Sequence, residues 1–205
     1  MNIQLNFINQ SYGTNDSDIV IFQRNVATNF DEITVAWKVI QHIAQGDHHS
    51  FVFPMTMQIA ATDSRGNFTP RTDAQNGQLF AMSATDAGDR LALIRVGTEP
   101  TEIQVLNNLP VGAIDAEIYR DGKLLARKTD IAPRHKGVFH FKPTIWIGAV
   151  SQVEEGEAMN AAIVSSIDTE LSLLGIASAN IVMTGGGPGA TSHPFAFALR
   201  DIVMA

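Results

Sequence analysis

The chain has 205 residues, a formal net charge of −7 and no cysteine, and 17% of its residues are charged. The missing cysteines exclude disulfides, thiol nucleophiles and thiolate zinc sites. Because nucleic-acid binders are basic, the acidic balance predicts no nucleic-acid partner.

The first part of the chain is patterned as β-strands. Residues 3–7 alternate between apolar and polar types, which is the period of a half-buried strand. The stretch 12–18 is rich in turn formers and leads to the apolar run 19–22, so the two runs predict an opening hairpin with a long loop. Apolar residues recur at every second position over most of 33–43, which favours a strand over a helix there.

Strand-like runs continue along the chain, separated by turn-rich segments such as 63–77. The most specific signal is Asp121-Gly122, which stands between the alternating runs 114–119 and 124–127. A type I′ turn needs two residues that tolerate positive φ, so this dipeptide predicts a tight hairpin. Further strands are predicted at 51–53, 55–59, 79–83, 91–96, 103–106, 138–141, 145–150, 180–183 and 195–204.

The segment 154–174 fits two structures equally well. Three glutamates at its start suit the positive end of a helix dipole, and its apolar residues form a stripe with helical spacing. The run 167–173 also alternates with the period of a strand. Helix and strand therefore both stay open for this segment.

Turns recur at short intervals, and no regular alternation of strand and helix patterns is present. We therefore predict a mostly β fold, namely an antiparallel β-sandwich or Greek-key-like single domain over 1–205, and one short helix stays open within it. Sheets of low charge with unpaired edges can add strands across a two-fold axis, so we expect a homo-oligomer.

The N-terminal residues lack a basic region and a continuous apolar region, so we expect no signal peptide. No apolar run reaches the length of a membrane-spanning helix, so we expect no transmembrane span. The cytoplasm is the default location that follows, and release by lysis or by a dedicated secretion machine stays open.

Half of the basic residues, 7 of 14, lie between Arg120 and Lys142, where the net charge is +5. If Asp121-Gly122 forms a hairpin, a basic ribbon results that suits an anionic partner. The alternative is a solvated edge hairpin, because edge strands carry lysine to block aggregation. The candidate ligand-binding residues are Arg120, Lys123, Arg127, Lys128, Arg134 and Lys136.

Four residues close in sequence form a candidate metal site, because neutral imidazole is a common metal ligand. These candidate ligands are His42, Asp47, His48 and His49. On a strand, His48 and His49 would point to opposite faces, so only a turn would let both reach one ion. The alternative is a set of exposed loop histidines.

The glycine-rich stretch 184–194 could present backbone N–H groups to a phosphate. It contains no lysine, and no helix start follows it, so a flexible connection between two strands is the favoured interpretation. Long polar loops on a rigid sheet scaffold commonly carry recognition, which makes 12–18, 63–77 and 184–194 candidate recognition loops.

We predict no catalytic residues, so the leading hypothesis is a non-enzymatic binding or interaction module without a cofactor. Its expected partner is a protein, a glycan or an anionic lipid surface. One alternative is a membrane-active β protein, lipid-binding or pore-forming, that docks through the basic hairpin. The other is a metal-dependent enzyme that holds a divalent ion through the histidine candidates.

Overall fold

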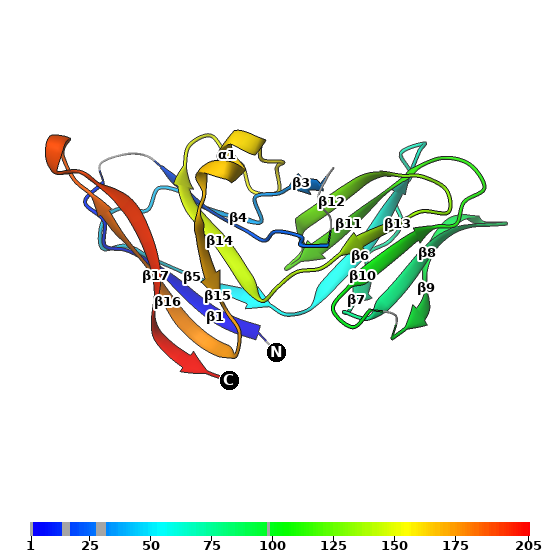
Figure 1. The fold of residues 1–205 in the computed structure, drawn as a ribbon, viewed down its shortest axis with the longest axis horizontal. Helices are drawn as coiled ribbons and strands as arrows, with labels where there is room; N and C mark the ends of the chain where they lie inside the picture. Colours follow the sequence, from blue (N-terminus) through cyan, green and yellow to red (C-terminus); the bar gives the residue numbers. More distant parts are fainter. Residues whose placement is uncertain (1, 14–16, 28–31, 98) are drawn as a thin grey trace. The chain divides into compact units, whose positions relative to one another are not determined.

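The computed structural model describes residues 2–13, 17–27, 32–97 and 99–205 (Figure 1). Strands make up 60% of the structure and helix 4%, and the sheets are largely antiparallel, which confirms the predicted mostly β class. Two compact units form. Unit 1 comprises Met1–Gln23, Val35–Met55 and Pro143–Ala205, and unit 2 comprises Arg24–Thr34 and Thr56–Lys142.

Unit 1 contains two four-stranded sheets. The first has the order β17-β16-β1-β5, in which only β1 and β16 run parallel among the described strands. Its strands are β1 (Asn2–Asn9), β5 (His48–Pro54), β16 (Ile176–Gly186) and β17 (His193–Met204). The second sheet has the order β15-β14-β2-β4 and is antiparallel. Its strands are β2 (Asp18–Phe22), β4 (Lys38–Ile40), β14 (Thr144–Val150) and β15 (Thr169–Ser172).

The inner face of unit 1 is apolar because its strands alternate. In β1, Ile3, Leu5 and Phe7 are buried, whereas the polar residues between them face outward. The ring of Trp37, just before β4, lies 5.4 Å from the ring of Phe53 in β5, centroid to centroid, in an edge-to-face arrangement. Side chains from the first sheet and from the residue next to β4 of the second sheet therefore meet in one core.

The outer face of the second sheet is covered by the segment after β14. Val20 and Phe22 of β2 pack against Met159 and Ile167 of this segment, which also contains the short helix α1 (Ala161–Ser166) (Figure 1). The Asn160 side chain caps α1 by accepting a hydrogen bond from the Ile163 N–H. The segment 154–174 thus contains a helix and then strand β15, so each open interpretation holds for a different part of it.

Unit 2 also contains two sheets. The four-stranded sheet β13-β10-β8-β9 again has a central parallel pair, β10 and β8. Its strands are β8 (Gln78–Thr85), β9 (Gly88–Val96), β10 (Ile103–Asn107) and β13 (Lys136–Phe139). The second sheet, β3-β12-β11-β6-β7, is antiparallel. Its strands are β3 (Glu32–Thr34), β6 (Met57–Asp63), β7 (Thr72–Ala74), β11 (Ile114–Arg120) and β12 (Lys123–Ile131).

The predicted hairpin at Asp121-Gly122 is confirmed, because β11 pairs antiparallel with β12 and Arg120 faces Lys123 in register. The φ angles of Asp121 and Gly122 are 54° and 71°, and both have the positive sign that a type I′ turn requires.

The predicted opening hairpin is wrong. Both edges of β1 are occupied by β16 and β5, so β2 pairs with other strands in the second sheet. Residues 14–16 of the loop between them lie outside the described residues. The predicted strand 33–43 is replaced by β3 and β4, which belong to different units. Among the described residues, none of the helices combines the length and apolar character that crossing a membrane requires.

Candidate functional site

Two arginines of the predicted basic ribbon are buried or ion-paired within unit 2. Arg120 is 4% exposed, and its removal from water lowers its pKa to about 10. Arg127 lies across from Glu117 in the β11–β12 hairpin, with its Nε 2.7 Å and its Nη2 2.5 Å from Glu117 Oε1. Because the Glu117 side chain is 1% exposed, the Arg127 charge compensates a buried carboxylate.

The same carboxylate also orders a tyrosine. The Tyr119 hydroxyl donates a hydrogen bond to Glu117 Oε2, and the Arg71 guanidinium lies 3.7 Å from the Tyr119 ring centroid. Burial, together with the hydrogen bond to Glu117, raises the pKa of Tyr119 to about 12. This face of the hairpin is therefore a charge network that is compensated within unit 2.

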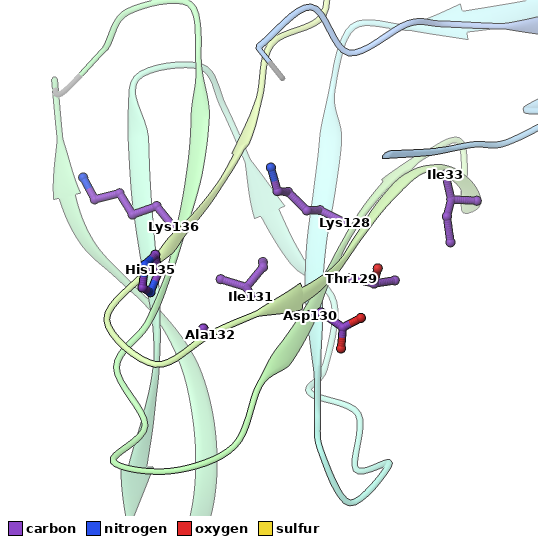
Figure 2. A pocket seen from close by; sticks show the side chains of 8 residues that line it. All are labelled: Ile33, Lys128, Thr129, Asp130, Ile131, Ala132, His135 and Lys136. Carbon is purple, nitrogen blue, oxygen red and sulfur yellow. The ribbon is translucent and has the colours of Figure 1, made fainter. Parts of the chain in front are cut away.

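The other four candidates of the ribbon divide into two pairs. Lys123 lies at the hairpin tip, and Arg134 is exposed in the connection between β12 and β13, where its φ is 67°. Lys128 and Lys136 lie at one cavity of about 540 Å³ in unit 2 (Figure 2). The structure thus brings two of the six predicted cations together in a concave site.

The cavity combines positive charge with apolar walls. Figure 2 shows the side chains of Lys128 and Lys136 on either side of Ile131, while the Asp130 carboxylate points away from both ammonium groups in this view. The described residues that line the cavity are Ile33, Lys128, Thr129, Asp130, Ile131, Ala132, His135 and Lys136. A volume of about 540 Å³ lies within the range of small-molecule sites.

A buried asparagine holds the loop that forms one side of the cavity. Asn107, at the end of β10, is fully buried, and its Nδ2 donates to the carbonyl oxygens of Ile131 and Gly112, both at 2.8 Å. Its backbone also accepts a hydrogen bond from the Arg134 N–H at 2.7 Å and donates one to the His135 carbonyl at 3.0 Å. These bonds fix the loop between Ile131 and Lys136, so the cavity is formed before a ligand arrives.

Two further residues position the lysines. The Lys136 Nζ donates to Gln104 Oε1 at 3.1 Å, which leaves other ammonium protons for a ligand. A Cβ on Gly137 would lie 2.6 Å from Ile131 Cδ1 and 3.6 Å from Lys128 Cδ. The absence of a side chain at Gly137 therefore lets Ile131 and the stem of Lys128 pack against the start of β13.

The metal candidates are not gathered into a ligand set. His48 and His49 both lie in β5, so their side chains alternate between the faces of the sheet. The Asp47 carboxylate accepts the Ala44 N–H at 2.9 Å and closes a turn, and His42 is exposed with a φ of 53°. Within the described ranges, no three His, Asp or Glu residues lie close enough to hold an ion. The described residues therefore add no geometric support to the metal-dependent hypothesis.

Sequence reasoning missed Asn107, Gln104 and Gly137. The first two end up beside the cavity because β10 and β13 pair, with Gln104 opposite Val138, and this pairing has no local signature. Gly137 stands directly after Lys136, and a glycine inside a short strand is a weak signal of a close packing contact. Comparison with protein-family models, with curated proteins and with solved structures finds no match.

Proposed function

We propose that the protein is a non-enzymatic binding module whose unit 2 captures an acidic sugar unit of a glycan. The observation that carries the proposal is the cavity in which Lys128 and Lys136 flank Ile131. A carboxylate or sulfate group on the ligand would accept hydrogen bonds from the two ammonium groups. The Thr129 hydroxyl and the Asp130 carboxylate supply partners for sugar hydroxyls, and Ile131 supplies an apolar wall.

An acidic glycan fits better than a membrane surface. A membrane would need a continuous cationic face, but Arg120 is buried and Arg127 compensates Glu117. Lys128 and Lys136 line one concave site together with Ile131, so they suit a single acidic group rather than an array of headgroups.

Calorimetric titration with a sulfated heparin disaccharide and with a carboxylated hyaluronan disaccharide tests the proposal. The double variant Lys128→Gln/Lys136→Gln is expected to lose at least about tenfold in affinity per lysine, because each ammonium makes a charge-assisted hydrogen bond. The matched control is Lys123→Gln/Arg134→Gln, which removes the same charge from the same segment outside the cavity, and it should bind as the unchanged protein does.

Two further measurements, binding at increasing salt and co-sedimentation with vesicles, distinguish a glycan from a lipid as the source of the acidic group. Binding of the disaccharides should weaken as salt rises, since the contact is between charges that solvent reaches. Co-sedimentation with neutral and anionic vesicles provides the second arm. If the protein binds anionic vesicles but neither disaccharide, the glycan proposal fails and the membrane-docking alternative replaces it.

We also propose that copies of the chain associate through β9. This strand ends its sheet among the described strands, and Leu93, Ile94 and Val96 are 46%, 54% and 68% exposed. Apolar side chains beside free backbone N–H and C=O groups favour pairing with another strand. Light scattering should give a mass above that of one chain, and Ile94→Lys should reduce it, whereas Val111→Lys, at an exposed loop position, should not.

A further inference from the structure

Three segments of unit 1 meet beside the glycine-rich loop and are fixed by backbone hydrogen bonds. The Gln10 N–H donates to the Met183 carbonyl at 2.9 Å, and the Tyr12 N–H donates to the Gly185 carbonyl at 2.8 Å. From the turn before β5, the Gly46 N–H donates to the Asn9 carbonyl at 2.7 Å. The residues after β1, the turn before β5 and the end of β16 therefore form one rigid rim.

This rim surrounds a cavity of about 460 Å³, and none of the described residues that line it carries a charged side chain. Uncharged polar groups come from Gln10, Gln45 and Thr184, and backbone comes from Gly46 and Gly185. The chemistry differs from that of the cavity in unit 2, where Lys128, Lys136 and Asp130 belong to the lining. The described lining suits an uncharged ligand that exchanges hydrogen bonds with amides and a hydroxyl.

Among the described residues that line this cavity, Tyr12 supplies the aromatic ring, and it is 69% exposed. Such a ring offers a flat π-face with a polar hydroxyl at its edge. Gln10 and Gln45 also line the cavity, and both are exposed. An exposed aromatic face beside two exposed amides presents a stacking surface with donors and acceptors around it.

A buried residue keeps this arrangement in place. Asn9 Oδ1 accepts hydrogen bonds from the Ser11 N–H at 2.9 Å and from the Ser11 hydroxyl at 2.7 Å. Its Nδ2 donates to the Ile43 carbonyl at 2.8 Å, which ties the turn before β5 to the end of β1. Asn9 is therefore a positioning residue, while its neighbours offer the ligand-facing groups.

The glycine-rich loop forms a wall of the cavity rather than a phosphate cradle. A Cβ on Gly185 would lie 2.2 Å from the Pro194 carbonyl oxygen, and one on Gly186 would lie 2.6 Å from the Gly13 nitrogen. Both glycines have positive φ, 97° and 75°. They are thus required by close backbone packing, which brings the main chain to the cavity without a side chain.

From these observations we propose that the cavity beside Tyr12 binds a neutral carbohydrate. The weakly positive C–H face of a pyranose ring stacks on the negative face of the Tyr12 ring. Hydroxyls of the sugar exchange hydrogen bonds with the side chains of Gln10, Gln45 and Thr184. The described lining residues offer no cation to pair with a phosphate, sulfate or carboxylate, and their amides disfavour a purely apolar ligand.

Saturation-transfer NMR followed by calorimetry tests this with maltotriose, cellotriose and N,N′,N″-triacetylchitotriose as probes. At least one probe should show saturation of its ring protons at about 10 mM, since dissociation constants near 1 mM are expected for so small a contact. Tyr12→Ala should abolish the signal or weaken binding at least about tenfold, and Tyr12→Phe should stay within about threefold because it keeps the ring face.

Phe68→Ala is the matched control, because Phe68 is equally exposed, at 68%, but belongs to unit 2. It should leave the signal unchanged, and so should Lys128→Gln/Lys136→Gln, which separates this site from the acidic-sugar site. The proposal is overturned if none of the three sugars gives saturation transfer, or if Tyr12→Ala, shown to be folded by circular dichroism, binds them as the unchanged protein does.

Discussion

Replacing Asn107 by alanine should destabilise unit 2 by about 3 kcal/mol. The side chain is fully buried and makes three hydrogen bonds, two from Nδ2 to the Ile131 and Gly112 carbonyls and one accepted by Oδ1 from the Leu109 N–H. Each contributes about 1 kcal/mol net, and the alanine cannot replace any of them. The same change frees the loop that lines the cavity, so affinity for the acidic disaccharides should fall as well.

Urea unfolding with two probes measures this. Both tryptophans, Trp37 and Trp146, belong to unit 1, whereas far-ultraviolet circular dichroism reports on the strands of both units. The circular dichroism transition should move to lower urea in Asn107→Ala. If 1–205 is a single cooperative domain, as the sequence predicts, the tryptophan transition moves with it; a tryptophan transition that stays in place would show that the units unfold separately.

Asn108→Ala is the matched control. Asn108 is exposed, and its side chain bonds only Ser83 Oγ, at 3.1 Å, among the described residues. Its replacement should cost no more than about 1 kcal/mol. The reasoning about buried asparagine is refuted if Asn107→Ala loses no more stability than this control.

Three further changes probe other parts of the fold. Phe22→Ala should lower the stability of unit 1 by about 3–5 kcal/mol, seen in the tryptophan transition, because it empties the core under α1. Tyr119 should ionise near pH 12 by ultraviolet absorbance, and Glu117→Gln should lower that pKa. Because folding raises the pKa of Tyr119, the protonated phenol stabilises the folded state. This stabilisation is present below pH 10 and is lost as the pH rises through 12. Gly185→Ala should cost at least about 2 kcal/mol by thermal unfolding, because its Cβ would overlap the Pro194 carbonyl; an unchanged melting temperature would contradict the packing described.

Local patterns predicted the features that depend on neighbours in sequence. The alternation in β1 and the turn at Asp121-Gly122 are such features, because side-chain period and positive φ are properties of a few adjacent residues. The prediction of an opening hairpin was wrong because both edges of β1 pair with strands far away in sequence, β5 and β16. Pairing between distant strands is decided by the packing of the whole unit.

Local sequence patterns could not predict the division into two units either. Unit 2 is made of two segments, and the chain returns to unit 1 between them, so composition changes little at the boundaries. The basic segment noted in the sequence contains Lys128 and Lys136 of the candidate cavity, but charge counting could not show that Arg120 is buried or that Arg127 faces Glu117. Burial and partner choice appear only once the strands are paired.

Amine footprinting of the lysines gives the most direct test of the acidic-sugar site. The protein is labelled with a limiting acetylating reagent, with and without the sulfated disaccharide, and each lysine is quantified by mass spectrometry. The account predicts that the disaccharide protects Lys128 and Lys136 and leaves Lys123 unchanged. Equal labelling of all three with and without ligand, or protection of Lys123 alone, would contradict it.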